Sequence, residues 1–292
     1  MTAGPAATPA RLRHSGVGLR HAHHAQALAP PGPQPGPAFV EVHAENFFGD
    51  GGAALQDLDA QLAGSGYAVL DAASLARLAA VPADAMAAWA PLWDDLPPDT
   101  FLKDGGRYRR RRHGCFVVTP SAGTVQAMPH RAHWQPVEYN ALHGGIERWF
   151  APLHAAMAEA PAWQQLLCRL AAHSARLRGL AADAPCHVEA HPFRIDTTDG
   201  IGRPTPEGAH RDGVDMVAVF LVGRHGVKGG ETRVFEADGP NGQRFTMTEP
   251  WTLLLLDDER VIHESTPIQP LQAGGHRDTL VLTYRAGGFQ GV

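Results

Sequence analysis

Residues 204–222 read PTPEGAHRDGVDMVAVFLV, and this stretch decides the fold and the site that the sequence predicts. A turn rich in Pro and Gly leads to His210 and Asp212, and an apolar run typical of a buried strand follows at once. Side chains two positions apart on an extended chain point to the same face. The imidazole of His210 and the carboxylate of Asp212 can therefore converge on one point.

A third polar side chain for that point is predicted at His263, which ends the run WTLLLLDDERVIH from residue 251. Two His and one carboxylate on one face, with the opposite positions open, form the ligand set of non-haem Fe(II) oxygenases. The tripeptide alone is weak evidence, because His-Arg-Asp occurs at both 210–212 and 276–278. Only the first copy is followed by several predicted strands and a later His.

Composition limits the possible classes of protein. The length of 292 residues fits one large domain or two small ones, and the net charge of −5 argues against a generic nucleic-acid binder. The three cysteines, 115, 168 and 186, form no Cys-x-x-Cys pair and favour a reducing cytoplasm. Neither a membrane-spanning run nor the apolar core of a signal peptide is expected.

The predicted organisation is an N-terminal arm over residues 1–54 and one domain over residues 55–292. The first 37 residues are rich in Ala, Pro, Gly and His, which is typical of a disordered tail. The several His residues there could bind a metal, but a solvated arm is the simpler interpretation.

Helices are predicted from apolar spacing. A short helix from residue 55 precedes a strand at 66–70, and Ser74 is expected to cap a helix that ends near residue 78. Further helices are predicted over residues 83–96, over 146–159 and from Pro161 to about residue 180. The buried face of the helix at 146–159 would carry Trp149, Phe150, Leu153 and Met157.

The C-terminal half is dense in predicted strands, punctuated by Gly and Pro. These strands cover residues 187–196, 215–222, 231–236, 251–256 and 279–284. Consecutive short strands without helices between them indicate a mainly β protein with flanking helices (α+β), built as a jelly roll, that is, a double-stranded β-helix barrel.

Residues 107–112 place five Arg in six positions, just before a predicted strand. Strand alternation puts Arg107, Arg109 and Arg111 on one face. Three interpretations remain open: structural ion pairs, contacts with a small anion, and binding to a polyanion.

The last predicted strand carries a candidate anion anchor. Positions 277, 279, 281, 283 and 285 alternate with an apolar set at 280, 282 and 284, so the first set should line the barrel lumen. A buried Arg needs an anionic partner, and its planar fork matches a carboxylate. Arg277 with Thr279 could hold a carboxylate beside the metal, although a salt bridge to a protein carboxylate is the alternative.

Several segments together resemble the bacterial 2-oxoglutarate/Fe(II) dioxygenases typified by L-isoleucine dioxygenase. The resemblance rests on DGGRYRRRR (104–112), PEGAHRDG (206–213), GGET (229–232), DERVIH (258–263) and HRDTLVLTY (276–284). It implies a jelly-roll barrel, His210, Asp212 and His263 on Fe(II), and Arg277 on the distal carboxylate of 2-oxoglutarate. The implied reaction consumes O2 and releases succinate and CO2 while it hydroxylates an unactivated C–H bond.

A second resemblance covers only residues 16–55. GVGLRH (16–21) and FVEVHAENFFGDGG (39–52) resemble the start of multinuclear non-haem iron oxidases, in which Glu45 and Asn46 would fall near the metals. One strand cannot make the barrel of that family. We interpret the stretch as a fusion remnant or a shifted gene start.

A free L-amino acid is the expected small-molecule substrate, and it would need contacts for its carboxylate and ammonium. The candidates are Tyr139, Asn140, Arg107, Arg194 and Glu207. Two alternatives remain: a zinc-dependent hydrolase that uses the same three ligands, and a non-catalytic jelly-roll binding module.

Overall fold

The computed structural model describes residues 39–41 and 58–291. The N-terminal His tract, Glu45 and Asn46 lie outside these residues. Within the predicted arm, the backbone of β1 (Phe39–Glu41) pairs in parallel with β10 (Gly242–Phe245).

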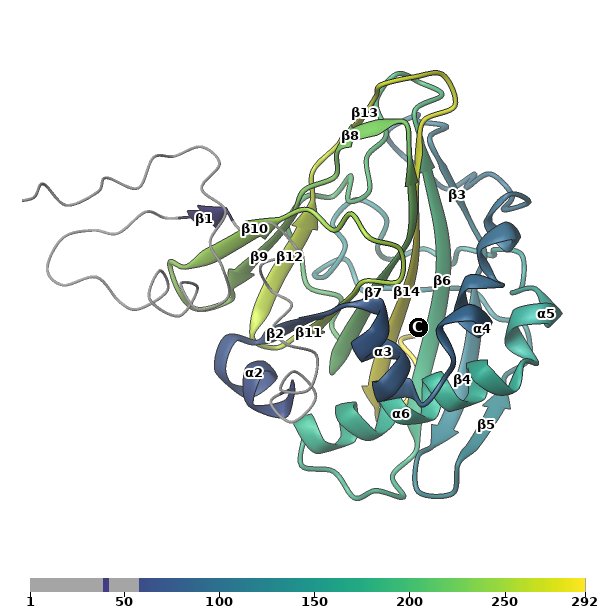
Figure 1. The fold of residues 1–292 in the computed structure, drawn as a ribbon, viewed down its shortest axis with the longest axis vertical. Coiled ribbons are helices and arrows are strands. Elements are labelled where there is room, and N and C mark those ends of the chain that lie inside the picture. Colours follow the sequence, from purple (N-terminus) through teal and green to yellow (C-terminus); the bar gives the residue numbers. More distant parts are fainter. Residues whose placement is uncertain (1–38, 42–57, 292) are drawn as a thin grey trace, which may run out of the picture.

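Two sheets form the body of the protein (Figure 1). The large sheet runs in the order β2-β11-β7-β14-β6-β4-β5, with β3 also paired to β6. Its strands are β2 (Tyr67–Leu70), β3 (Arg109–Arg111), β4 (Gly114–Thr119), β5 (Thr124–Ala127), β6 (Cys186–Asp196), β7 (Met216–His225), β11 (Leu253–Asp257) and β14 (His276–Ala286). The small sheet runs in the order β1-β10-β9-β12, with β9 (Thr232–Glu236) and β12 (Val261–Ser265). A separate pair joins β8 (Val227–Gly229) to β13 (Ile268–Pro270). The predicted mainly β jelly roll with flanking helices is confirmed.

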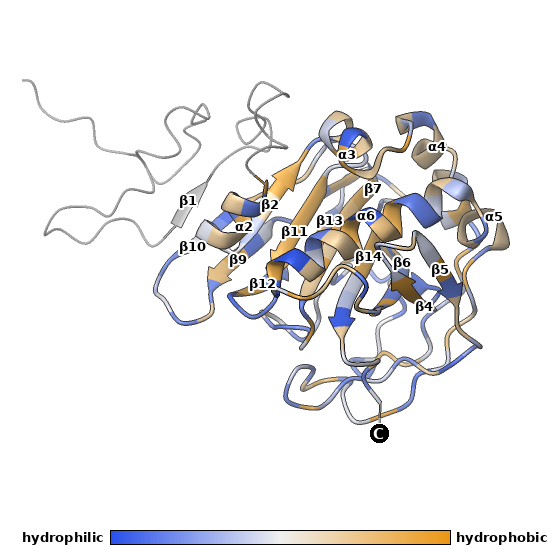
Figure 2. Cartoon of the chain, turned by 90° about the horizontal axis from the view of Figure 1, so that it is seen from below, coloured by the Kyte–Doolittle hydropathy of each residue, from blue (hydrophilic) through white to orange (hydrophobic). Residues whose placement is uncertain are grey.

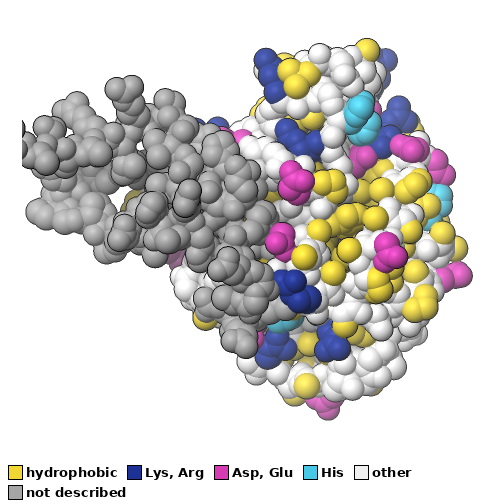
Figure 3. Space-filling model, in the orientation of Figure 1, with side chains coloured by type: hydrophobic (Ala, Val, Ile, Leu, Met, Phe, Trp, Pro, Cys, Tyr) yellow, Lys and Arg dark blue, Asp and Glu magenta, His cyan; other side chains and the backbone are white. Residues whose placement is uncertain are grey.

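The helices are α2 (Leu58–Ser65), α3 (Ala72–Ala79), α4 (Ala83–Ala87), the 3-10 helix η2 (Ala90–Trp93), α5 (Ala155–Ala158) and α6 (Pro161–Leu177). They cover one face of the large sheet (Figure 2). On the surface seen in Figure 3, acidic and basic side chains are interspersed around an apolar area on the helix-bearing side. Over residues 58–291, no helix has the length and apolar character needed to cross a bilayer.

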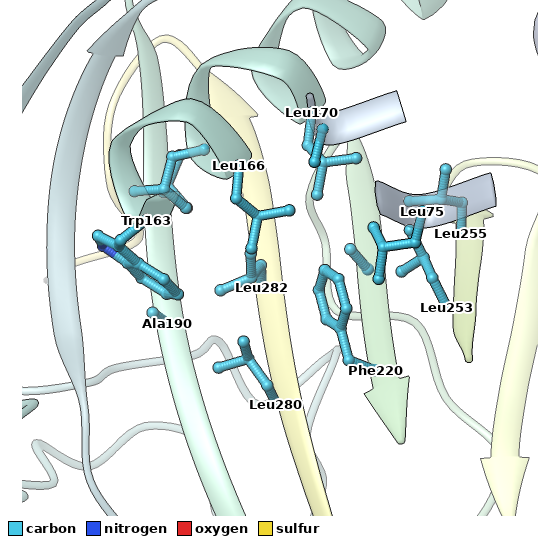
Figure 4. Packing of buried hydrophobic residues seen from close by; sticks show 14 of the residues in the cluster. Leu75, Trp163, Leu166, Leu170, Ala190, Phe220, Leu253, Leu255, Leu280 and Leu282 are labelled. Carbon is cyan, nitrogen blue, oxygen red and sulfur yellow. The ribbon is translucent and has the colours of Figure 1, made fainter. Parts of the chain in front are cut away.

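The alternation of β14 decides which of its residues meet the helices. Leu280, Leu282 and Tyr284 belong to the core that α6 covers, where Trp163 and Leu166 reach the sheet (Figure 4). The odd-numbered residue Val281 packs on the other face, in the core between the two sheets. The predicted division of β14 into an apolar face toward the helices and a lumen face is therefore confirmed.

Two helices near the N-terminal end of the domain differ from the helices predicted from the sequence. Asp71, and not Ser74, caps α3, because its carboxylate accepts the N–H of Ser74 at 2.6 Å. The helix predicted over 83–96 is divided into α4 and η2, since Pro91 cannot donate the hydrogen bond that a continuous helix requires.

The helix predicted over 146–159 is wrong except for α5. The backbone of Arg148 instead forms an antiparallel bridge with His133, and Pro152 prevents a continuous helix. Phe150 and Met157 are buried as predicted, but Trp149 is 52% exposed.

Candidate active site

His210 and His263 face each other across a two-residue antiparallel bridge. Each backbone N–H donates to the carbonyl of the other, at 3.1 and 3.0 Å. Asp212 follows two residues after His210, so its carboxylate lies between the rings, 3.9 Å from Nε2 of His210 and 3.8 Å from Nε2 of His263. The three donor atoms all lie within 4.8 Å of one another. The structure thus brings together the three side chains that the sequence singled out.

Hydrogen bonds hold this group in place. Nδ1 of His210 donates to the carbonyl of Gly208 at 2.9 Å, which leaves Nε2 with its lone pair toward Asp212. Gln135 Nε2 donates to Oδ1 of Asp212 at 3.3 Å. Sequence reasoning missed Gln135, because it comes from an irregular segment with no periodic pattern.

Asp258 fixes the loop that carries Asp212. Its buried carboxylate accepts the backbone N–H groups of Asp212, Gly213 and Val214 at 3.0, 2.7 and 3.1 Å. Gly213 has a φ of 73°, and a Cβ there would lie 2.4 Å from the ring of Tyr139. Only glycine fits that turn without moving Tyr139.

Asp258→Asn should loosen this loop. The amide cannot accept all three N–H groups, so at least one buried donor loses its partner at a cost of roughly 2 kcal/mol. Urea unfolding should show that loss, and equilibrium dialysis should show weaker binding of any divalent metal that His210, Asp212 and His263 hold. The exposed Asp238→Asn serves as control; equal stability of the two variants would contradict this role of Asp258.

The charges of the three side chains influence one another. Burial raises the pKa of the Asp212 carboxyl, although the His210 imidazole opposes it. Burial, together with His210, lowers the pKa of His263 to about 3. Burial would lower the pKa of His210, but Asp212 and Glu207 outweigh it and the net shift is upward. A metal needs neutral imidazoles and an ionised carboxylate, so its binding would displace protons from this group.

The three side chains line an open cavity. Val281, Thr283 and Arg285 of β14 also line it, as the predicted lumen face requires. Arg277 and Thr279 are not among its lining residues and lie further toward the start of that strand.

Arg277 is buried, with 3% of its surface exposed. It makes no salt bridge to any carboxylate of residues 58–291, and its Nε has no hydrogen-bond partner there. Burial, together with the neighbouring Arg224, lowers the pKa of Arg277 to about 10, which leaves it charged at neutral pH. Within residues 58–291, Arg277 therefore does not form the salt bridge to a protein carboxylate that was the alternative to a ligand anchor.

The candidate substrate contacts divide into two sets. Asn140 and Glu207 line the cavity, and Tyr139 packs beside it against Gly213. Arg107 is exposed and pairs with Asp199, at 2.9 Å. Arg194 pairs with Asp278 and Asp94, at 2.7 and 3.0 Å. Neither Arg107 nor Arg194 reaches the cavity, because each is held by carboxylates elsewhere.

The arginine run is used mainly for structural ion pairs. Arg109 pairs with the buried Asp99 at 2.7 Å, and Arg110 and Arg112 contact Asp196 and Asp95 at 3.4 and 3.3 Å. Arg111 differs, because its Nη2 donates to Nδ1 of His191 at 2.7 Å.

A second group that could hold a metal is formed by His113, His133, Glu189 and His191, all buried. Oε2 of Glu189 lies 2.6, 3.2 and 3.6 Å from ring nitrogens of His133, His113 and His191. A guanidinium only donates, so Arg111 leaves the Nδ1 of His191 as acceptor and puts the ring proton on Nε2. We therefore interpret the group as a hydrogen-bonded cradle for the Glu189 carboxylate. Only the spacing Glu-x-His at 189–191 hints at it in the sequence.

Acid should destabilise the metal-free protein through this cradle. Burial lowers the pKa values of His113 and His191, and that of His133 to about 3. Below the ordinary His pKa of about 6.5, the unfolded chain therefore binds protons that the folded chain excludes. Each ring then removes about 1.4 kcal/mol of stability per pH unit.

Urea unfolding at pH 7.5, 6.5 and 5.5 measures this slope. His133→Asn should reduce this slope by the share of one ring, about 1.4 kcal/mol per pH unit, and the exposed His225→Asn should leave it unchanged. Stability that stays constant between pH 6.5 and 5.5 would mean that the three rings are protonated in the folded protein.

Comparison with known proteins identifies the family to which this chain belongs. The family model described as 2OG-Fe dioxygenase matches residues 90–283. The solved structure of a bsmA homolog from Methylobium petroleophilum PM1 has 56% sequence identity and a TM-score of 0.77, and the match covers 81% of this chain and 94% of that one. A search of curated proteins finds no significant match.

Two distant structures agree in fold. IDO from Bacillus thuringiensis has 14% identity and a TM-score of 0.64, over 80% of this chain and 96% of that one. The Fe(II)/(alpha)ketoglutarate-dependent dioxygenase TqaL has 18% identity and a TM-score of 0.60, over 82% and 91%. At these identities the likeness concerns the fold alone.

The molecule is thus a non-haem iron dioxygenase by class. It belongs to the 2OG-Fe dioxygenase family, whose members use Fe(II), 2-oxoglutarate and O2 and act on small molecules. The zinc-hydrolase and non-catalytic alternatives are not favoured.

Proposed function

We propose that His210, Asp212 and His263 hold the Fe(II) of this dioxygenase. The convergence of their three donor atoms within 4.8 Å, from segments far apart in the sequence, carries the proposal. Imidazole nitrogen and carboxylate oxygen suit Fe(II), and three ligands on one side leave room for cosubstrate and O2. The hydrogen bond from His210 to Gly208 supports it, because it leaves Nε2 free to coordinate.

Arg277, with Thr279, is the proposed partner of the distal carboxylate of 2-oxoglutarate. A buried guanidinium without a counter-charge is costly unless a ligand supplies one. Arg277 is such a group within residues 58–291, and its planar fork can bind a carboxylate through two N–H groups.

In this family, bound Fe(II) with 2-oxoglutarate and O2 supplies the oxidising power, and 2-oxoglutarate leaves as succinate and CO2. The chain's own residues contribute positioning. Gln135 orients Asp212, Asp258 holds the loop below it, and the cavity walls keep the reacting C–H bond close and water limited.

The proposed reaction is hydroxylation of an unactivated C–H bond in a free L-amino acid or a similar small molecule. The lining of the cavity carries both acidic and basic side chains, which suits a small molecule that bears both charges. Asn140 and Glu207 are the proposed contacts at its wall, with Tyr139 behind them. The three free cysteines suit a reducing compartment such as the cytoplasm.

Anaerobic Fe(II) and 2-oxoglutarate should give a weak visible charge-transfer band with the purified protein. In air, with ascorbate, succinate release is then screened against the free L-amino acids. A colourless mixture together with zinc-dependent hydrolysis would overturn the proposed metal site. A band without stimulation by any amino acid would remove only the proposed substrate.

A further inference from the structure

Four arginines line the cavity, and the three buried ones differ in which groups neutralise or contact their charge. Arg109 is neutralised by Asp99. Arg111 is stacked between Phe150 and Phe193, with its guanidinium carbon 4.0 and 4.3 Å from the two ring centroids. Arg148 has neither arrangement.

Arg148 is only 2% exposed. Its Nη2 donates to the neutral Oε1 of Gln135 at 2.9 Å, and its Nε has no partner in the described part of the chain. No carboxylate of residues 58–291 forms a salt bridge with it. A buried guanidinium that lines a cavity and has no carboxylate partner can bind an anion that enters from solvent.

The position of Arg148 relates that anion to the metal ligands. Gln135 accepts from Arg148 and donates to Asp212, at 2.9 and 3.3 Å. Arg148 therefore lies two hydrogen bonds from the proposed metal-ligand carboxylate of Asp212, and an anion bound to it could present the rest of a small molecule to the site.

Glu189 supplies the opposite charge on the same wall. Its contacts with the three imidazoles all use Oε2, and within the described residues Oε1 has no hydrogen-bond partner. Burial alone would raise its pKa, but His133 and the hydrogen bonds from the three rings hold the pKa of Glu189 well below its ordinary value. An ionised carboxylate and a guanidinium without a salt bridge therefore line the same cavity.

We propose that Arg148 and Glu189 bind the head group of a zwitterionic amino-acid substrate, an inference that rests on the proposed function. Arg148 takes its carboxylate and Glu189 takes its ammonium, so the side chain extends toward His210, Asp212 and His263. Two separate buried guanidiniums, Arg277 and Arg148, then meet the two anions that such a reaction requires, the cosubstrate and the substrate.

Equilibrium dialysis under anaerobic conditions tests the assignment. The first probe is the proteinogenic L-amino acid that the wild type binds most tightly. The second is the corresponding amine without the carboxylate, and the third is the corresponding acid without the amino group. Wild-type protein should bind the amino acid at least about 30-fold tighter than either truncated probe.

Arg148→Gln should weaken the amino acid and the acid about 100-fold and leave the amine within about 3-fold. Glu189→Gln should weaken the amino acid and the amine and leave the acid unchanged. Arg107→Gln, outside the cavity, should change none of them. An unchanged cosubstrate half-saturation and a single cooperative unfolding transition establish that the variants are folded.

Four results would overturn the proposal: no amino acid binds the wild type; Arg148→Gln weakens all three probes alike; Arg148→Gln raises the half-saturation for 2-oxoglutarate; or Glu189→Gln removes a second metal ion per chain. The dialysis is repeated without iron. A wild type that binds the amino acid but gives no band with Fe(II) and 2-oxoglutarate would contradict the proposed metal site and leave the head-group site standing.

Discussion

Replacing His210 by Ala should remove Fe(II) binding and lower 2-oxoglutarate turnover to below about 1% of wild type. Loss of groups that merely orient a metal ligand already costs 10- to 100-fold, and His210 is a proposed ligand itself. Metal content after dialysis and succinate release per protein chain are the two measurements.

The matched control is His225→Ala, an exposed imidazole remote from the three proposed ligands in sequence. It should keep one Fe(II) per chain and wild-type turnover. Retention of iron and turnover by His210→Ala would contradict the proposed ligand set, whereas retention of iron without turnover would indicate that the remaining two ligands suffice to bind but not to react.

Arg277→Gln should raise the 2-oxoglutarate concentration for half-saturation about 100-fold. Removing one partner of a buried charged contact costs about 2–5 kcal/mol, and about 2.7 kcal/mol corresponds to 100-fold. Titration of the anaerobic visible band with 2-oxoglutarate measures this directly, without reliance on a substrate.

Arg277→Lys should recover part of the affinity, because the charge remains and the planar fork is lost. Arg233→Gln, which removes a partly exposed partner of Glu231 and Glu264, should leave the titration unchanged. An unchanged half-saturation in Arg277→Gln would show that another cation holds the cosubstrate.

The sequence predicts well those strands and helices in which apolar residues recur at a regular spacing or in a continuous run. The strands that became β6, β7, β9, β11 and β14 are visible as apolar runs between Gly and Pro, and the helix from Pro161 is visible in its apolar spacing. The grouping of His210 with Asp212 follows from strand geometry. His263 could be included because it ends an apolar run, and the structure places it opposite His210.

The remaining residues depend on contacts that no local pattern contains. Gln135 and Arg148 lie in irregular chain, where position is set by long-range contacts with His133 and Asp212. Glu189 shares its strand with one imidazole partner, His191, but the other two, His113 and His133, come from distant segments. The error over 146–159 has this origin only in part. The backbone bridge of Arg148 to His133 is a long-range contact, whereas Pro152 is a local signal against a helix that apolar spacing outweighed.

The reciprocal backbone bonds between His210 and His263 have a consequence for assembly. These two hydrogen bonds form only when β12, which carries His263, pairs with the loop before β7, which carries His210. Backbone hydrogen bonds of the closed barrel thus set the positions of these two proposed metal ligands. A chelator should strip the metal and leave a folded, reloadable protein, unlike a zinc finger, which unfolds without its metal.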